Sequence, residues 1–160
     1  MTSPSEQFRF RETTRLILNK FGRMASLIEI GCGGGHQSLH LQHICDRLTG
    51  LDVGARAVKR ARRRCRESAF LVGDIFSQKV YALAPFDLVV KCEVLYYMND
   101  VPAALRQMQA LGTNCLITYF GDELEALDPQ VLESVPGALS ANLAFRQFRW
   151  RVMWCHGCQA

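Results

Sequence analysis

The feature that most constrains this chain is a cluster of glycines directly after a short apolar run. Leu27–Ile30 is followed by the sequence Gly31-Cys32-Gly33-Gly34-Gly35. An apolar run that stops at glycine is typical of a buried parallel strand whose backbone turns sharply at its end. Glycine permits that turn, and it lets a ligand lie directly on the main chain because no side chain stands in the way.

A second apolar run places a carboxylate near that turn. We expect a helix from His36 to about Arg47 and a strand over Leu48–Val53, in which Asp52 stands 21 residues after Gly31. A helix after the glycines would point free amide groups at a ligand. In a strand–helix–strand unit, a carboxylate at the tip of the neighbouring strand can accept hydrogen bonds from both hydroxyls of a ribose. The stretch therefore predicts a nucleoside-binding site.

The glycine spacing distinguishes two classes of nucleoside ligand. Dinucleotide-binding proteins use G-x-G-x-x-G, whose third glycine lets the helix pack closely on the strand. A histidine occupies that third position here, and the pattern is instead Glu29-x-Gly31-x-Gly33-x-Gly35. This pattern resembles the first motif of the class I S-adenosylmethionine-dependent methyltransferases. The resemblance implies that Glu29, Cys32 and the three glycines bind the methionine part of S-adenosylmethionine.

Further segments match that family in the expected order. The resemblance implies that Asp52 holds the ribose and that Val53 adds an apolar wall. Asp74 and Ile75 follow a third predicted strand and resemble the family's adenine site, where a carboxylate accepts from the adenine amino group and an apolar residue packs on the ring. Asp74 alone could equally be a turn residue that caps its own backbone.

The segment Phe86–Tyr97 is the second informative stretch. Leu88–Val90 predicts a central strand, and polar residues follow at its carboxyl end, where ligands bind in open parallel sheets. The segment resembles the family's F-D-x-V-x-x-x-E-V-L-x-x motif, in particular the nodulation protein S type of small-molecule N-methyltransferases. The resemblance implies that the backbone near Cys92 meets the methionine ammonium. Glu93 is the nearest candidate base and Tyr97 the nearest orienting hydroxyl. The alternative is that Glu93 only caps the following turn and that Tyr96 or Tyr97 is pocket wall.

Periodicity predicts the remaining elements. We expect an N-terminal helix over residues 6–20, a strongly basic helix over Gly54–Glu67, a helix over Ala103–Leu111 capped by Asp100, and a strand over Cys115–Phe120. The basic helix is interpreted as a solvated face. Without interleaved aromatic residues, nucleic-acid binding is not expected.

The C-terminal part is expected to close the sheet. Asp128 and Pro129 are expected to open a short helix. The alternation from Phe148 predicts a strand with one buried face. Whether Leu143–Phe145 forms a second strand is left open. The expected fold is therefore α/β, a doubly wound, mostly parallel sheet with an antiparallel C-terminal edge strand. Residues 1–160 are expected to form a single domain.

Two clusters of potential metal ligands are not expected to bind a metal ion. His36, His40 and His43 would share one helical face, as in some zinc sites, but a polar face is the preferred interpretation. Cys155 and Cys158 form one terminal C-x-x-C, for which unpaired thiols are preferred over a zinc or redox site. No metal is expected.

Composition and the first residues argue against a membrane-spanning or a secreted protein. The 160 residues are 49% hydrophobic and 21% charged, with a net charge of +4. This is ordinary globular material. No apolar run approaches the ~20 residues of a membrane-spanning helix. The first residues lack the apolar core of a secretory signal, and the 7 cysteines fit reduced thiols, so we expect a cytoplasmic protein without a membrane partner.

Taken together, these features predict an S-adenosylmethionine-dependent methyltransferase that transfers a methyl group to an N or O atom of a small molecule. The alternative is a non-catalytic S-adenosylmethionine-binding or scaffolding subunit of a larger complex. A homodimer or a partner subunit that completes the pocket is left open, as are the acceptor and the length of the natural chain.

Overall fold

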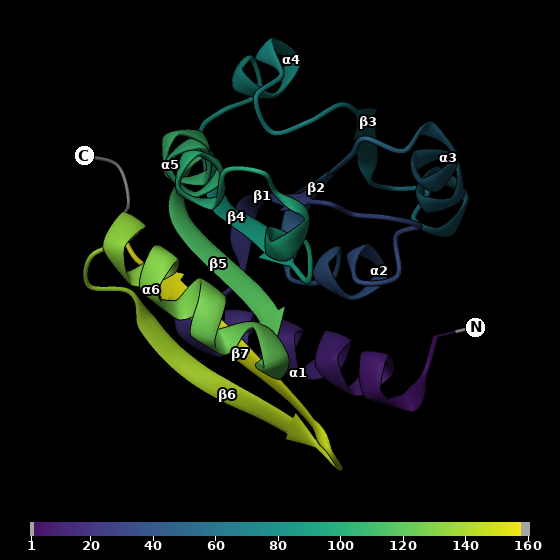
Figure 1. The fold of residues 1–160 in the computed structure, drawn as a ribbon. Coiled ribbons are helices and arrows are strands. Elements are labelled where there is room, and N and C mark those ends of the chain that lie inside the picture. Colours follow the sequence, from purple (N-terminus) through teal and green to yellow (C-terminus); the bar gives the residue numbers. More distant parts are fainter. Residues whose placement is uncertain (1, 158–160) are drawn as a thin grey trace. The chain divides into compact units, whose positions relative to one another are not determined.

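In the computed structural model, which describes residues 2–157, the chain divides into two units, Met1–Asp74 and Ile75–Ala160 (Figure 1). The first unit contains α1 (Pro4–Phe21), β1 (Met24–Ile30), α2 (Ser38–Leu41), β2 (Cys45–Asp52), α3 (Ala55–Arg64) and β3 (Ala69–Val72). Its three strands run parallel in the order β3-β2-β1. The predicted α/β class is therefore confirmed for this unit.

The second unit carries the rest of the sheet. Its strands follow the order β4-β5-β7-β6, in which β4 and β5 are parallel and the β5–β7 and β7–β6 pairs are antiparallel. Its elements are α4 (Gln78–Tyr81), β4 (Phe86–Cys92), the 3-10 helix η1 (Leu95–Tyr97), α5 (Val101–Leu111), β5 (Gly112–Phe120), the 3-10 helix η2 (Gly121–Glu123), α6 (Leu124–Ser134), β6 (Leu139–Phe145) and β7 (Phe148–Cys155). The predicted antiparallel C-terminal edge is confirmed.

Helix ends follow local capping chemistry. Ser3 and Glu6 form a capping box at the start of α1, and Gly22, at φ 72°, ends that helix. The Asp100 carboxylate accepts a hydrogen bond from the backbone amide of Ala103 at 2.8 Å, as predicted for the start of α5. The expected start of α6 is wrong, because the helix begins at Leu124 and contains Pro129 in its interior.

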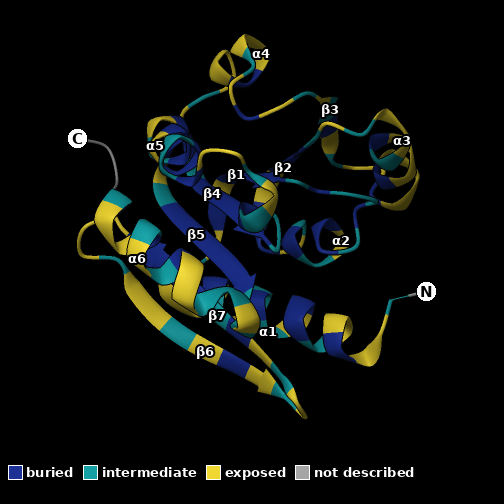
Figure 2. Cartoon of the chain, viewed as in Figure 1, coloured by how far each residue is buried: buried dark blue, intermediate teal, exposed yellow. Residues whose placement is uncertain are grey.

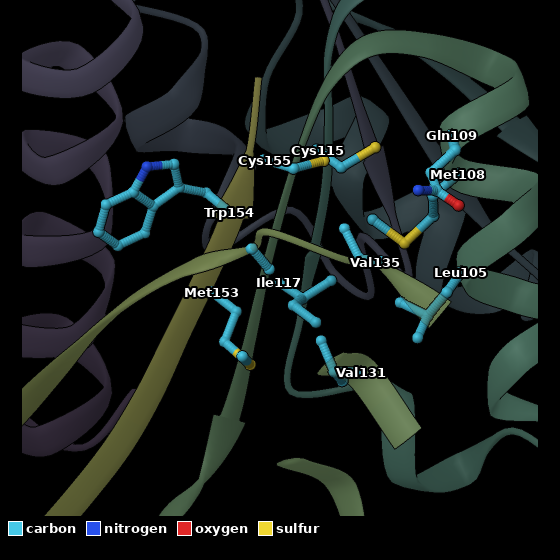
Figure 3. Close-up of a pocket in the computed structure, with 11 residues that line it drawn as sticks. Leu105, Met108, Gln109, Cys115, Ile117, Val131, Val135, Met153, Trp154 and Cys155 are labelled. Atoms are coloured by element: carbon cyan, nitrogen blue, oxygen red, sulfur yellow. The ribbon is translucent and has the colours of Figure 1, made fainter. Parts of the chain in front are cut away.

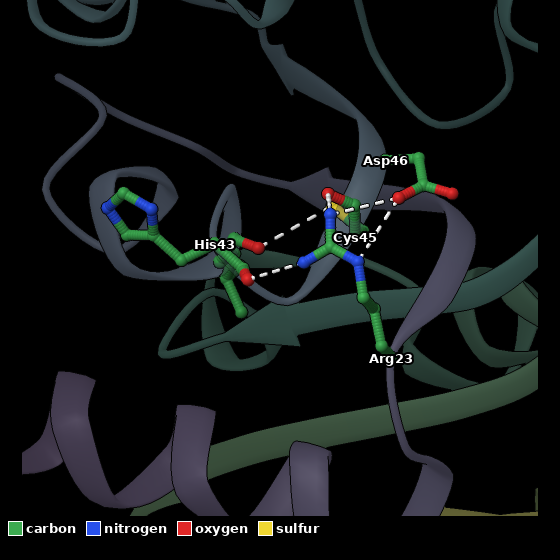
Figure 4. Close-up of polar contacts among 5 residues, drawn as sticks. Arg23, His43, Cys45 and Asp46 are labelled. Atoms are coloured by element: carbon green, nitrogen blue, oxygen red, sulfur yellow. Dashed lines mark hydrogen bonds and ion pairs between the residues drawn. The ribbon is translucent and has the colours of Figure 1, made fainter.

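The helix predicted from His36 to about Arg47 is also wrong. Only Ser38–Leu41 is helical, and β2 begins at Cys45, where it pairs with Met24 of β1. Arg23 explains the early end. Its guanidinium donates to the carbonyl oxygens of His43 at 2.9 Å and Cys45 at 3.2 Å and pairs with the Asp46 carboxylate at 2.9 Å (Figure 4). These contacts hold His43, Cys45 and Asp46 beside the residue that precedes β1, in a conformation that a helix continuing to Arg47 would not allow.

The C-terminal hairpin is more extensive than the sequence pattern indicates. β6 runs from Leu139 to Phe145 and pairs with β7 along its whole length. The chain turns at Arg146, whose φ is 55°. β5 is buried along most of its length, whereas β6 is largely exposed (Figure 2).

One polar cluster fastens α6 to this hairpin. The Asp128 carboxylate on α6 pairs with the Arg151 guanidinium on β7 at 2.8 Å and accepts from the Tyr119 hydroxyl on β5. Arg151 also donates to the Asn142 side-chain oxygen on β6 at 2.9 Å. Hydrogen bonds shared in this way satisfy partly buried charges that would otherwise be costly.

An apolar cavity of about 20 Å³ lies in the core of the second unit, bounded by side chains of α5, α6, β5 and β7 (Figure 3). Leu105, Met108, Ile117, Val131 and Met153 are among its lining residues. A void this small is a packing gap rather than a ligand site. Within residues 2–157, none of the helices is long and apolar enough to cross a membrane.

The turn after β1 packs tightly on α3. A Cβ atom at Gly35, whose φ is 77°, would lie 2.9 Å from the Ala61 Cα atom, whereas a Cβ atom at Gly33, φ 53°, would meet no atom within 4 Å. Both positions favour glycine for their backbone conformation, but only Gly35 also needs it for packing.

These two glycines therefore predict different losses of stability. Gly33→Ala should cost only the strain of a left-handed residue, about 1 to 2 kcal/mol. Gly35→Ala should cost about 1 to 3 kcal/mol more, because α3 must move away from the new methyl group. Urea denaturation of both variants checks this difference, and equal midpoints would contradict the packing role of Gly35.

Candidate functional site

The loop of residues 31–35, here the glycine loop, follows β1 directly. Gly31, Gly33 and Gly35 all have positive φ, at 78°, 53° and 77°. The amides of Gly31 and Cys32 donate to the Leu51 carbonyl oxygen at 2.7 and 3.0 Å, and the Gly35 amide donates to the Cys32 carbonyl oxygen at 2.9 Å. The loop is therefore held by two hydrogen bonds to β2 and one within itself. The helix behind the loop, α2, is a single turn and not the long helix predicted from His36.

Asp52 connects the glycine loop to the end of β2. One carboxylate oxygen accepts from the Gly33 amide at 2.8 Å, and the other accepts from the Gly54 amide at 2.8 Å. A carboxylate offers about four lone-pair directions, so each oxygen retains room for one more donor. The sequence placed Asp52 near the glycines, and the structure brings the two into contact.

An apolar surface lies beside this carboxylate. The Val53 side chain is 74% exposed, although it directly follows a buried strand. The space over Gly33 is open, since a Cβ atom there would meet no neighbouring atom. The end of β2 therefore presents an acceptor group, Asp52, followed by an exposed apolar residue, Val53, and Asp52 bonds to the open backbone at Gly33.

Glu29 lies beneath the loop rather than at its surface. It is 2% exposed and accepts a hydrogen bond from the Ser38 hydroxyl. Burial raises the pKa of Glu29 to about 8, although the Ser38 hydrogen bond and the nearby Arg9 guanidinium act in the opposite direction. The predicted contact between Glu29 and a ligand stays a prediction. In the structure the Glu29 side chain is buried and bonds to Ser38 on α2.

Cys32 is also turned inward. Its side chain is 5% exposed and belongs to a core cluster with Val58, Ala61, Cys65 and Phe70. Burial raises the pKa of the Cys32 thiol to about 12, so the thiol is not a nucleophile at neutral pH. Only the backbone of Cys32 remains available for the predicted ligand contact.

The predicted adenine residues fall at the boundary between the two units. Asp74 ends the first unit and is exposed, and Ile75 begins the second and is 2% exposed. The neighbouring Phe76 is 49% exposed and was not predicted. Packing of Ile75 on an adenine ring stays a prediction, and Phe76 is a further apolar surface at the same position in the chain.

The end of β4 in the second unit has an unusual backbone. Glu93 has a φ of 58°. This left-handed conformation is uncommon outside glycine and concentrates at functional sites. The Glu93 amide donates to the Thr118 carbonyl oxygen at 2.9 Å, and the Thr118 hydroxyl donates to the Glu93 carboxylate at 2.9 Å. The preceding Cys92 is 9% exposed. Two contacts with β5 thus hold Glu93 in this conformation.

Of the two tyrosines after Glu93, Tyr96 contacts the Glu93 carboxylate and Tyr97 does not. The Tyr96 hydroxyl donates to the second Glu93 carboxylate oxygen at 3.4 Å. Tyr97, which the sequence favoured, is 76% exposed, and its ring packs edge-on against that of Tyr96 at a centroid distance of 4.6 Å. Sequence reasoning missed Tyr96 and Thr118. The short spacing between Glu93 and Tyr96 in a tight turn was the available signal for the first, whereas Thr118 lies on another strand.

Among residues 2–157, the histidines and cysteines do not gather into a metal-binding cluster. His36 and His43 lie outside α2, so the shared helical face expected for the three histidines is wrong. Within residues 2–157, no group of three or more His, Cys, Asp or Glu side chains could hold a metal ion. Cys32, Cys45, Cys65, Cys92 and Cys115 are free and buried. The expectation of unpaired terminal thiols is wrong at Cys155, which is disulfide-bonded, and Cys158 lies outside the described residues.

The buried Glu29 predicts a pH dependence of stability. Between the ordinary carboxyl value of 4.5 and about 8, the folded state holds a proton that the unfolded state releases, so stability should fall as pH rises through this window. Glu29→Gln removes the titration. The free energy of unfolding of the variant relative to the wild type should increase by about 1 kcal/mol per pH unit.

Chemical denaturation at pH 5, 6, 7 and 8 measures this difference. A difference between variant and wild type that stays constant over the series would show that Glu29 keeps an ordinary pKa in the folded protein.

Comparisons with known proteins place this chain among relatives of one family. Nodulation protein S of Sinorhizobium fredii (strain NBRC 101917 / NGR234) is 40% identical over 101 residues, which is 61% of this chain and 45% of the relative. The protein of the same name from Bradyrhizobium diazoefficiens is 35% identical over 116 residues, or 69% of this chain and 54% of the relative. The chain thus spans about half the length of these curated relatives.

A solved structure shows the same fold. The N-methyltransferase NodS from Bradyrhizobium japonicum WM9, in complex with S-adenosyl-L-homocysteine, superposes with a TM-score of 0.77 at 24% identity and covers 97% of this chain and 88% of its own. Residues 1–127 match the nodulation protein S (NodS) family. Since that match covers well over half of the chain, this protein belongs to the nodulation protein S family.

Proposed function

We propose that this chain is an S-adenosylmethionine-dependent methyltransferase that acts as one domain and methylates an N or O atom of a small molecule. The bond from the Gly33 amide to the Asp52 carboxylate carries the proposal, because it joins an open glycine loop to a carboxylate with free acceptor capacity. Family membership supports it, as does the N-methyltransferase name of the solved NodS structure, which contains S-adenosyl-L-homocysteine.

The residues present fit the cofactor. The backbone of the glycine loop would hold the methionine part, with the peptide near Cys92 as a further contact. The Asp52 carboxylate would accept from the ribose hydroxyls, for which both of its oxygens have remaining lone pairs. Val53, Asp74 and Ile75 are assigned to the adenine. Glu29 supports the loop from below, through Ser38.

The chemistry required of the protein is modest. S-adenosylmethionine supplies, when bound, a methyl group on a sulfonium with a neutral leaving group. The protein then contributes mainly alignment and exclusion of water. An amine or hydroxyl acceptor must also lose a proton, and we assign the role of base to Glu93, whose carboxylate is held by the Thr118 hydroxyl.

We further propose that the protein acts in the cytoplasm. Five free, buried cysteines support this assignment, because unpaired thiols persist in a reducing compartment. They outnumber Cys155, the one disulfide-bonded cysteine among the described residues, which by itself would favour an oxidising compartment.

Removal of the Asp52 carboxylate tests the cofactor site. Asp52→Ala should weaken binding of S-adenosylhomocysteine at least tenfold, since each hydrogen bond to a charged group contributes about 1.5 to 3 kcal/mol. Isothermal titration calorimetry measures this affinity. Asp46→Ala is the matched control, because Asp46 is an exposed carboxylate at the other end of the same strand, where it pairs with Arg23. Equal affinity of Asp52→Ala and wild type would overturn the ribose assignment.

Substitution of the candidate base tests catalysis separately. Glu93→Gln should lower methyl turnover by about 10²-fold or more while affinity for S-adenosylhomocysteine stays within about twofold, because a general base acts on the acceptor and not on the cofactor. Radiolabelled methyl transfer and calorimetry on the same preparation provide the two values. Unchanged turnover would refute the role of Glu93.

A further inference from the structure

A groove of about 420 Å³ opens in the second unit beside the turn after β4. Its walls come from Tyr96, from Met98–Pro102, which includes the start of α5, and from Glu123, Ala126, Leu127 and Gln130 at η2 and α6. This volume is within the range of small-molecule sites, about 300 to 1,000 Å³. The groove therefore has room for a small acceptor.

The lining has a distinct charge. All ten lining residues lie within the described chain, and they include two carboxylates, Asp100 and Glu123, and two side-chain amides, Asn99 and Gln130, but neither Lys nor Arg. One Asp100 oxygen already accepts from the Ala103 amide. A groove with two negative charges attracts amines and polyhydroxyl compounds, and it repels carboxylates and phosphates.

Tyr96 connects this groove to the candidate base. It lines the groove, and its hydroxyl donates to a Glu93 carboxylate oxygen at 3.4 Å. Hydrogen bonds of this kind are often long before substrate binds and shorten in the reacting complex. A tyrosine hydroxyl donates one hydrogen bond and accepts others at the same time, so it can receive a proton as it gives one up.

The other side of Glu93 is fixed. Thr118, which is fully buried, donates its hydroxyl to the other Glu93 carboxylate oxygen at 2.9 Å, and its carbonyl oxygen accepts from the Glu93 amide. Thr118 thus orients Glu93 so that its remaining oxygen faces Tyr96. The ring of Tyr97 packs edge-on against that of Tyr96 and supports its position.

We propose that this groove binds a molecule with no net negative charge whose uncharged amine or hydroxyl group is the methyl acceptor, and that Tyr96 relays the proton of that group to Glu93. This inference rests on the proposed methyltransferase function. The acceptor's lone pair forms the new bond to the methyl carbon while the carbon–sulfur bond breaks and its electron pair stays on sulfur. The acceptor's proton passes to the Tyr96 oxygen, and the original Tyr96 proton passes to Glu93.

The acceptor class is tested with three compounds that share a phenol ring and differ in charge: tyramine, tyrosol and 4-hydroxyphenylacetate. Radiolabelled methyl transfer should be greatest with tyramine and at least tenfold lower with 4-hydroxyphenylacetate. Glu123→Lys should reduce the preference for tyramine at least tenfold, whereas Asp122→Lys, a neighbour outside the lining, should preserve it.

The outcomes separate the two proposals. If S-adenosylhomocysteine fails to bind the wild type, the proposed function fails. If it binds but none of the three compounds is methylated, or the carboxylate is preferred, the assignment of the groove is overturned.

The relay is tested by removing one hydroxyl. Tyr96→Phe should lower the turnover of tyramine at least 30-fold, with affinity for S-adenosylhomocysteine within twofold of wild type. Tyr81→Phe removes a tyrosine hydroxyl that bonds Gln107 outside the groove, and it should leave turnover unchanged. Because Tyr96 and Glu93 act as one unit, the Tyr96→Phe/Glu93→Gln double variant should be no slower than the slower single variant.

A purely structural role for Tyr96 would give a different pattern. Multiplicative losses in the double variant, or normal turnover in Tyr96→Phe, would overturn the relay.

Discussion

The hydrogen bond from the Gly33 amide to the Asp52 carboxylate is the contact on which the candidate site of the first unit depends. It joins the end of β2 to the loop that follows β1. The register between these two parallel strands therefore determines where the Asp52 carboxylate lies relative to the loop. The Leu51 carbonyl oxygen, which accepts from Gly31 and Cys32, reinforces the same connection. A loop held at both ends in this way is ordered before any ligand arrives, which reduces the entropy cost of binding.

The three candidate carboxylates occupy different environments, and these environments separate their roles. Glu29 is buried beneath the loop, where burial raises its pKa and suits it to a structural hydrogen bond with Ser38. Asp52 is half-buried and receives two backbone amides, which suits an acceptor that must bind hydroxyl groups. Glu93 receives hydroxyl donors from Thr118 and Tyr96, and those contacts fix the orientation of its carboxylate.

The sequence allowed correct prediction of features that depend on neighbouring residues. The α/β class, the glycine turn and the Asp100 cap follow from local spacing and capping chemistry. The failures have a common cause in long-range contacts. The helix after the glycine loop ends early because Arg23, which precedes the whole segment, binds the carbonyl oxygens of His43 and Cys45. Periodicity within the segment carries no information about that guanidinium.

The same argument explains why the sequence did not show which tyrosine contacts Glu93. Both Tyr96 and Tyr97 follow Glu93 closely, and their order in the chain does not show which hydroxyl reaches the carboxylate. The left-handed backbone of Glu93 decides it, because the 3-10 turn that follows brings Tyr96 back toward Glu93 and leaves Tyr97 exposed. Thr118 holds Glu93 in that conformation from the neighbouring strand, as part of the β4–β5 pairing. The choice between two adjacent side chains is therefore made by β5, a strand that comes a whole helix later in the chain.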